Sequence, residues 1–216
     1  MSKALVIAID GPAAAGKGTI ATRLADHFLL PHLDTGLLYR AIGRIMADRG
    51  FDIENAEIAT QIAESLDPED LKDPRLRGHE AGGLASRVAV HVPVRTALVD
   101  MQREFARRAP GAVLDGRDIG TVICPDAQVK IFVTASPEVR AHRRTNELNA
   151  KGREVLYETI LAEILDRDAR DAGRTTAPLK PAEDAVILDT SGLDREGAFQ
   201  RAVEIVNAGL AATSVG

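Results

Sequence analysis

The sequence predicts an α/β fold: a doubly wound, five-stranded parallel sheet flanked by helices. Short apolar runs rich in β-branched residues recur at 4–10, 112–115, 129–135 and 185–189. Amphipathic stretches lie between or after them, at about 17–29, 93–109, 137–150, 154–171 and 194–210. Strands that alternate with helices are typical of such a sheet, whose ligands bind at the carboxyl ends of the strands. With 216 residues, 45% of them hydrophobic, the chain can bury one substantial core, so we expect a single domain.

Two helix starts are marked by capping residues, at 136–138 (SPE) and at 191–194 (SGLD). Ser and Asp cap helices, and Pro suits the first helical turn. Residues 54–85 differ from the rest, because they are polar, contain Asp-Pro pairs at 67–68 and 73–74, and have no clear strand run. We interpret them as part of an inserted cap rather than as a second domain.

A glycine-rich segment connects the first apolar run to the first helical stretch. It consists of Gly11, Pro12, Ala13, Ala14, Ala15, Gly16, Lys17, Gly18 and Thr19. Between a strand and a helix, such a segment forms a loop whose backbone N–H groups bind phosphate, aided by the helix N-terminus. Lys17 would reach the β- and γ-phosphates of a nucleotide, and Thr19 could help to order Mg²⁺ or phosphate. We therefore predict a nucleotide-phosphate site.

The loop departs from the strict G-x-x-x-x-G-K-[ST] pattern, because Gly18 takes the hydroxyl position and Thr19 comes one residue later. This G-K-G-T variant is more similar to nucleoside monophosphate kinases than to motors or GTPases. The alternative is a glycine-rich turn without a ligand. The absence of an N-K-x-D motif from the sequence argues against a GTPase.

Arginines at several places could bind a second phosphate group. Arg117 and Asp118 follow the run at 112–115, so they should emerge at the carboxyl edge of the sheet. Helical spacing also groups two further sets, Arg140, Arg143 and Arg144, and Arg167, Arg170, Asp171 and Arg174. The alternative for these sets is a solvated salt-bridge face with Glu163, Asp166 and Asp168. Thr35 and Arg40 follow the first helical stretch closely, although a capped surface helix would explain them too.

Composition excludes several classes of protein. The formal net charge of −5 argues against a protein that coats nucleic acid, while the excess of Arg over Lys suits a concave site for small phosphorylated molecules. Cys124 is the single cysteine, so no intramolecular disulfide can form, and we expect a structural role for it. The N-terminal apolar run is too short for a signal sequence or a membrane span, so we expect a cytoplasmic protein.

Five segments resemble the bacterial cytidylate kinases, the CMP/dCMP kinases among the P-loop nucleoside monophosphate kinases. In chain order they are GPAAAGKGT, LDTGLLYR, VLDGRDIGTV, AHRR and RDARDAGRTTAPL, and the resemblance extends over nearly the whole chain. It implies transfer of the γ-phosphoryl group of ATP to CMP or dCMP, in pyrimidine nucleotide metabolism. The phosphate loop alone leaves the acceptor open, so UMP, AMP or shikimate remain alternatives, as does a non-catalytic ATP-binding module.

The same resemblance implies roles for individual residues. The acceptor phosphate would be held by Thr35, Arg40, Arg117 and Arg174. The cytosine edge would be read by Ser86, Arg95 and Asp118, and the ribose would be contacted by Arg167 and Asp171. We expect the catalytic residues to be Lys17, Arg117, Arg167 and Arg174. ATP would be bound by residues 11–19 together with Arg143 and Arg144.

We further expect Mg²⁺ as the cofactor, held mainly through the ATP phosphates, with Thr19 as an additional candidate ligand. The expected partners are ATP and CMP or dCMP, with no nucleic acid and no membrane, and the expected state is a monomer. The single domain would comprise a core of about 1–35, 86–143 and 175–216, an acceptor-side insert at about 36–85 and a lid at about 144–157.

Overall fold

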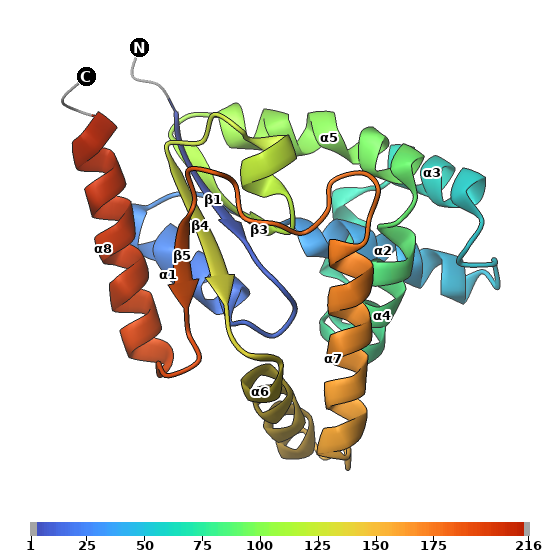
Figure 1. Cartoon of the computed structure of the whole chain (residues 1–216). Helices are drawn as coiled ribbons and strands as arrows, with labels where there is room; N and C mark the ends of the chain where they lie inside the picture. The colour runs from blue at the N-terminus through green and yellow to red at the C-terminus, as the bar shows by residue number, and fades with distance from the viewer. Residues whose placement is uncertain (1–3, 214–216) are drawn as a thin grey trace. The chain divides into compact units, whose positions relative to one another are not determined.

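The computed structural model describes residues 4–213. Within them the chain forms one five-stranded sheet in the order β2-β3-β1-β4-β5 (Figure 1). The strands are β1 Leu5–Asp10, β2 His32–Asp34, β3 Gly111–Gly116, β4 Val129–Thr134 and β5 Val186–Asp189. β1 pairs in parallel with β3 and β4, and β4 pairs in parallel with β5. The predicted five-stranded parallel α/β fold is confirmed.

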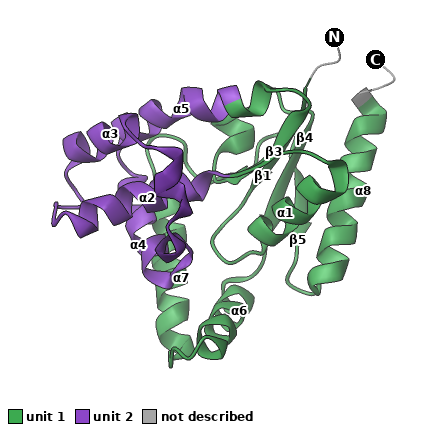
Figure 2. Ribbon diagram, turned by 180° about the vertical axis from the view of Figure 1, so that it is seen from behind, with its two compact units in different colours: residues 1–33, 105–216 green, residues 34–104 purple. Residues whose placement is uncertain are grey.

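Helices connect the strands. The α-helices of the described residues are α1 Lys17–Phe28, α2 Thr35–Asp48, α3 Ala56–Glu64, α4 His79–Val88, α5 Val92–Arg107, α6 Pro137–Ala150, α7 Tyr157–Ala172 and α8 Arg195–Thr213. Shorter turns are the 3₁₀ segments η1 Pro68–Lys72 and η2 Pro74–Arg77 and the π turn η3 Ile119–Ile123. The chain divides into two compact units, residues 1–33 with 105–216, and residues 34–104 (Figure 2).

The core of the first unit lies between the central strands and the helices α1 and α8. Ile7, Ile9 and Ile131 of β1 and β4 are completely or almost completely buried there. α1 buries Ile20 and Leu24 against them, four residues apart on one helix face. Each such aliphatic side chain contributes about 1.5–3 kcal/mol by leaving water. This packing fixes α1, and with it the loop that precedes α1.

The strand register brings the carboxyl ends of the strands to one edge. Asp10 at the end of β1 lies opposite Gly116 at the end of β3, and Thr134 at the end of β4 lies opposite Asp189 at the end of β5. Because these strands are parallel, the segments that follow them leave the sheet at the same edge. The glycine-rich loop follows β1, and Arg117 and Asp118 follow β3.

The second unit, residues 34–104, is helical. α2, α3 and α4 bury a shared set of side chains that includes Leu38, Ile42, Met46, Ile62 and Val88. The unit contains residues 54–85, in which the sequence showed no clear strand run, and the structure places short helices there. The two Asp-Pro pairs begin the turns η1 and η2, each with the Asp side chain as its cap.

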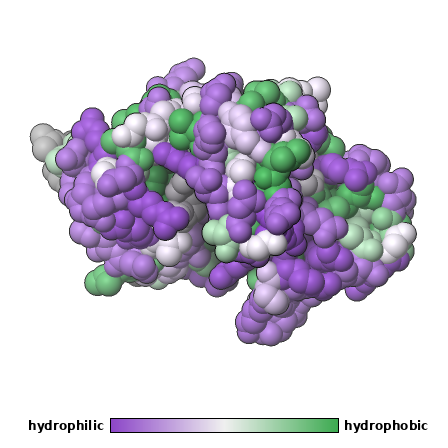
Figure 3. Space-filling model, turned by 90° about the horizontal axis from the view of Figure 1, so that it is seen from below, coloured by the Kyte–Doolittle hydropathy of each residue, from purple (hydrophilic) through white to green (hydrophobic). Residues whose placement is uncertain are grey.

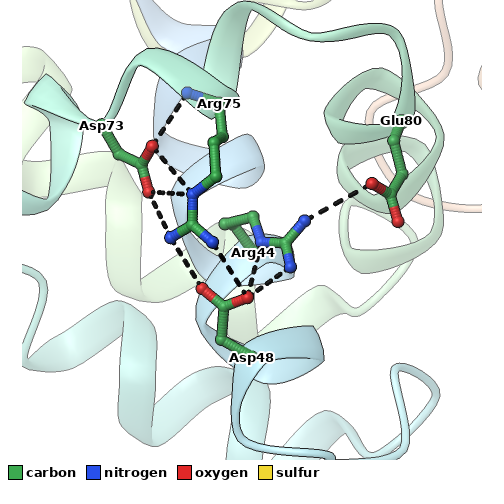
Figure 4. Close-up of polar contacts among 5 residues, drawn as sticks. All are labelled: Arg44, Asp48, Asp73, Arg75 and Glu80. Atoms are coloured by element: carbon green, nitrogen blue, oxygen red, sulfur yellow. Dashed lines mark hydrogen bonds and ion pairs between the residues drawn. The ribbon is translucent and has the colours of Figure 1, made fainter.

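An ion-pair network joins three elements of the second unit (Figure 4). Arg44 of α2 donates to Asp48 of the same helix and to Glu80 of α4, and Arg75 of η2 donates to Asp48 and Asp73. The hydrogen bond from Arg44 is the main cause that lowers the pKa of Asp48, and that from Arg75 is the main cause for Asp73. The network therefore connects the η2 segment to α2.

The face shown in Figure 3 is mostly hydrophilic, and its apolar residues form small separate patches. Leu29, just after α1, and Leu156, just before α7, are the most exposed large apolar side chains among the described residues. None of the helices within residues 4–213 is long and apolar enough to cross a membrane.

Candidate active site

The glycine-rich loop leaves β1 at Asp10 and enters α1 at Lys17. Gly11 has a φ of 148°, and a Cβ atom there would lie only 2.0 Å from the carbonyl oxygen of Val133. Gly16 has a φ of 91°, with open space around the position of its missing Cβ. Glycine is therefore required at both places, by the close approach of β4 at Gly11 and by the backbone conformation at Gly16.

Three side chains bind carbonyl groups of this loop. Lys17 Nζ donates to Pro12 O at 3.3 Å, and Arg140 Nη1 donates to Ala13 O at 3.3 Å. Thr190 Oγ1 donates to Ala15 O at 3.0 Å. These bonds fix the carbonyl groups of the loop, while the first turn of α1 supplies partial positive charge at the end of the loop. The arrangement suits an anionic ligand such as a nucleotide phosphate.

Asp171 of α7 is the centre of a buried arginine cluster in the first unit. Its side chain is 1% exposed and accepts hydrogen bonds from Arg117 Nε, at 2.9 Å, and from Arg174 Nη2. Arg167 Nε lies 3.9 Å from Asp171 Oδ2. Burial pushes the pKa of Asp171 up, but the three arginines outweigh it and hold that pKa below its ordinary value. The ionised carboxylate therefore gathers three guanidinium groups, which are the groups best suited to bind phosphate.

Arg140 connects α6 to α7 and to the phosphate loop. Its side chain is 3% exposed, and it pairs with both carboxylate oxygens of Asp168, at 3.0 and 2.5 Å. Its Nε donates to Ala135 O at 2.9 Å, and its Nη1 also reaches Ala13 O. Through these contacts Arg140 helps to hold the phosphate loop in place.

The other two arginines of α6 have different partners. Arg143 donates to Thr190 Oγ1 at 3.0 Å, to Thr190 O at 2.6 Å and to Leu193 O at 3.2 Å. Arg144 pairs with Glu147 at 2.8 Å, one turn further along the same helix. Arg143 thus contacts the segment that follows β5, whereas Arg144 pairs with a residue of its own helix.

The second unit contains four predicted acceptor-side residues, Thr35, Arg40, Ser86 and Arg95. Thr35 begins α2 and is buried, and Arg40 pairs with Asp34 just before that helix. Ser86 is buried on α4. The buried Arg95 guanidinium lies 5.7 Å from the ring centroid of Tyr39. Polar side chains buried to this extent belong to an organised site or to a hydrogen-bonded core.

Asp10 holds the turn that follows β3. Its carboxylate accepts hydrogen bonds from the N–H groups of Ile119 and Gly120, both at 2.7 Å. Burial is the largest cause that raises the pKa of Asp10, to about 6, against the lowering effect of these two bonds. Asp118 precedes the turn and is buried beside it.

Asp115, the next-to-last residue of β3, pairs with a histidine. His32 Nε2 lies 2.7 Å from Asp115 Oδ1, and His32 Nδ1 lies 3.4 Å from Thr22 Oγ1 of α1. Asp115 Oδ2 lies 3.9 Å from the position that a Cβ atom of Gly18 would take. The carboxylate of Asp115 is therefore oriented beside the first turn of α1.

The described residues contain no group of three or more His, Cys, Asp or Glu side chains that could hold a metal ion. Thr19 is exposed in the first turn of α1. Cys124 is a free, buried thiol.

Comparison with known proteins identifies the family. The family model described as cytidylate kinase matches residues 7–208. A cytidylate kinase of Methylocella silvestris is 58% identical over 202 residues, which cover 94% of each chain. A cytidylate kinase of Rhodopseudomonas palustris (strain TIE-1) is 55% identical over 204 residues, which cover 94% of this chain and 96% of that one. This chain belongs to the cytidylate kinase family.

The fold of this cytidylate kinase family member is shared with more distant proteins. A gluconokinase from Sinorhizobium meliloti 1021 superposes with a TM-score of 0.52, over 99% of this chain and 95% of that one. Its sequence identity is 15%, so this likeness concerns the fold alone.

The structure brings several predicted residues of the cytidylate kinase family pattern together. Arg117, Arg167 and Arg174 gather around Asp171, and Lys17 lies in the loop that begins at the same edge of the sheet. Thr35 and Arg40 lie about one and a half turns apart on α2. Arg143 and Arg144 are neighbours in sequence but bind separate partners.

Sequence reasoning missed Asp10, Asp115 and Thr190 in this cytidylate kinase family member. Asp10 and Asp115 come at or near the end of a buried strand, at the edge where ligands bind. An acidic residue that ends an apolar run was therefore an available signal. Thr190 offered no such signal, because a single threonine after a strand is common in any fold.

Proposed function

We propose that this chain transfers the γ-phosphoryl group of ATP to CMP or dCMP, giving CDP or dCDP. The observation that carries the proposal is the buried Asp171 cluster, which gathers three arginines at the edge of the sheet where the phosphate loop also begins. One loop suits the phosphates of ATP, and a separate set of guanidinium groups suits a second phosphorylated molecule. The relatives that share more than half of their residues with this chain are named cytidylate kinases.

Phosphoryl transfer depends on position and positive charge rather than on a protein nucleophile. Lys17 binds the β- and γ-phosphates, while Arg117, Arg167 and Arg174 surround the transferring group and the acceptor phosphate. Arginines in such positions contribute about 10³- to 10⁵-fold in rate in other phosphoryl-transfer enzymes. Arg143 and Arg144 contact ATP from α6.

On the acceptor side, Thr35 and Arg40 bind the phosphate of CMP together with Arg117 and Arg174. Ser86, Arg95 and Asp118 read the cytosine edge. Arg167 and Asp171 contact the ribose. The burial of Ser86, Arg95 and Asp118 supports these roles, because desolvated hydrogen-bonding groups discriminate strongly between bases.

Mg²⁺ is the cofactor of the proposed reaction, held mainly through the ATP phosphates. When bound, it neutralises phosphate charge. Thr19, exposed in the first turn of α1, is the candidate side-chain ligand, and Asp115 offers a nearby carboxylate of the kind that holds Mg²⁺ in P-loop NTPases.

The chain works as a single kinase domain, with an acceptor-side insert at about 36–85 and a lid at about 144–157 that excludes water. Lid closure matters, because water at the γ-phosphate would make the enzyme an ATPase. We place the enzyme in the cytoplasm as a monomer whose partners are its two nucleotides, without nucleic acid or membrane. The net charge of −5 supports the absence of nucleic acid.

The test is ATP consumption with Mg²⁺ while CMP, dCMP, UMP, AMP and shikimate are offered separately, with identification of the phosphorylated product. We expect turnover with CMP and dCMP and little with the other three. Preference for UMP, AMP or shikimate would overturn the acceptor but leave the phosphate loop in place. ATP binding without acceptor-dependent turnover would favour a non-catalytic nucleotide-binding module.

A further inference from the structure

A single carboxylate in the first unit connects two segments that are far apart in sequence. Asp10 directly precedes Gly11, the first residue of the phosphate loop. Its two oxygens accept from the N–H groups of Ile119 and Gly120, which are 109 and 110 positions away. Arg117 and Asp118 come immediately before these two residues.

The turn that receives these bonds has an unusual geometry. Ile119–Ile123 form one π turn, in which Ile123 N and Cys124 N donate to carbonyls five residues earlier. Such turns are rare and frequently lie at functional sites. Asp118 immediately precedes this turn, with φ −146° and ψ 26°, so its backbone is neither extended nor helical. The direction in which Asp118 and Arg117 leave β3 therefore depends on where the turn is held.

Packing alone does not account for a carboxylate at this position. Asp10 is 5% exposed, and its neighbours in β1 are the apolar residues Ile7, Ala8 and Ile9. An ionised group is costly to bury, and a neutral side chain would fill the space at a lower cost. A carboxylate, however, presents two oxygens that each accept one N–H group in the same plane, which no apolar side chain can do.

We propose that Asp10 is a positioning residue, which holds the Ile119–Gly120 turn so that Asp118 and Arg117 are correctly directed toward the acceptor nucleotide. The proposal rests on the proposed function, since it assigns Asp10 a part in binding CMP. Asp10 itself touches backbone groups. Its loss should therefore weaken binding of the acceptor more than binding of ATP.

Two substitutions disturb the same contact from opposite sides. Asp10→Asn keeps the shape but replaces one acceptor oxygen with an NH₂ group, which faces an N–H group. In Gly120→Ala, the new Cβ would lie 3.4 Å from Asp10 Oδ2 and 3.2 Å from Lys130 Cδ, so those side chains must shift by a few tenths of an ångström. Asp26→Asn, on the exposed surface of α1, is the matched control for the loss of one negative charge.

The experiment measures the Kd of CMP and of ATP separately by calorimetry for the parent and the three variants, together with KM and kcat. For Asp10→Asn we expect the Kd and KM of CMP to rise about tenfold or more, as for loss of a charge-assisted hydrogen bond, and those of ATP to change less than about threefold. Gly120→Ala should also raise the Kd and KM of CMP more than those of ATP, but by a smaller factor. Asp26→Asn should change neither the values for CMP nor those for ATP. Equal changes for both nucleotides, or no change for CMP in either variant, would overturn the proposal.

A second measurement does not depend on turnover. The amide ¹H and ¹⁵N shifts of Ile119 and Gly120 should titrate in the parent with a midpoint near the Asp10 pKa of about 6 and should lose this transition in Asp10→Asn. Asp118 and Lys17 lie close enough to influence Asp10, and Lys130 packs on Gly120, so the variant is needed to assign the midpoint. Amide shifts of Ile119 and Gly120 that are the same in the parent and in Asp10→Asn would overturn the proposal, even if the parent phosphorylates CMP. A parent that neither binds nor phosphorylates CMP overturns the proposed function instead.

Discussion

Arg117 and Asp171 lie 54 positions apart in the sequence, and Arg117 Nε donates to Asp171 Oδ2 at 2.9 Å. This bond joins the segment after β3 to α7, and Arg174 binds the other oxygen of the same carboxylate. The cluster can therefore form only when the sheet and α7 are both in place.

Asp171→Asn should destabilise the fold, because it leaves three guanidinium groups without their buried counterion. Loss of one partner of a buried ion pair costs about 3–5 kcal/mol, which urea denaturation at pH 7 would measure. The pKa of Asp171 lies below its ordinary 3.8, so its stabilisation is present above that pH and is lost as the pH falls through the pKa of the folded state. Asp166→Asn, exposed on the same helix, is the control, and equal free energies of unfolding in the two variants would contradict the prediction.

The effect of Asp10→Asn on stability should depend on pH in the opposite sense. The pKa of Asp10 is raised from 3.8 to about 6, so its contribution to stability is complete below pH 3.8 and is lost as the pH rises through 6. Because the variant lacks this titration, the stability of the parent relative to Asp10→Asn should fall by about 1–3 kcal/mol between pH 3 and pH 7. Thermal denaturation across that pH range measures it. A parent whose stability relative to the variant rises from pH 3 to pH 7 would show that the fold favours the ionised form.

Lys17→Ala should abolish most of the phosphoryl transfer while the fold remains intact. Removal of one preorganised donor to the developing charge costs about 10²- to 10³-fold in kcat. The measurement is ATP consumption with saturating CMP, with circular dichroism as the check on folding. Lys72→Ala, at an exposed pair with Glu69, is the control. Near-normal turnover in Lys17→Ala would remove the phosphate loop from the mechanism.

Gly11→Ala and Gly16→Ala should differ in stability although they change the same loop. The Cβ at position 11 meets the Val133 carbonyl, so we expect a loss of at least ~3 kcal/mol, whereas position 16 has space and should lose about 1–2 kcal/mol through its positive φ. Thermal denaturation without ligand would compare them. Equal losses would mean that β4 can move away from the loop.

Arg143→Ala and Arg144→Ala should separate a structural contribution from a nucleotide contact. Arg143 binds Thr190 and Leu193, so its loss should cost about 1–2 kcal/mol of stability and also raise the KM of ATP. Arg144 pairs with Glu147 near the surface, so its loss should change stability by less than ~0.5 kcal/mol while still raising that KM. An unchanged KM in both variants would exclude these two residues from the ATP site.

Much of the fold could be predicted because its signals are local. Each of β1, β3, β4 and β5 is an apolar run that the sequence shows directly, and Ser136 caps α6 as predicted, since its Oγ accepts from Val139 N at 3.3 Å. At 191–194 only Asp194 caps a helix, and Ser191 accepts from Ser136 N instead. Neighbouring residues determine a cap, but tertiary contacts determine which of two candidates is used.

The rest of the fold and of the site depends on contacts that the spacing of residues in the sequence does not reveal. β2 has three residues, too few for an apolar run to be recognised. The helices in the 54–85 region are also short: α3 has nine residues, and α4, which begins there, has ten. Helical spacing could predict that Arg167, Asp171 and Arg174 share a face. It could not predict that Arg117 joins them, because that contact depends on the register of the sheet.

Thr190 joins several segments of the first unit through hydrogen bonds. Its N–H donates to Thr134 O at 2.8 Å, its hydroxyl reaches Ala15 O, and Arg143 binds both its side chain and its carbonyl. The phosphate loop near the N-terminus therefore derives part of its shape from a residue that is made late in synthesis. During translation, a chain released only up to β4 would already contain every glycine of the loop, yet it could not hold Ala15 in place, so nucleotide binding should begin only after β5 has left the ribosome.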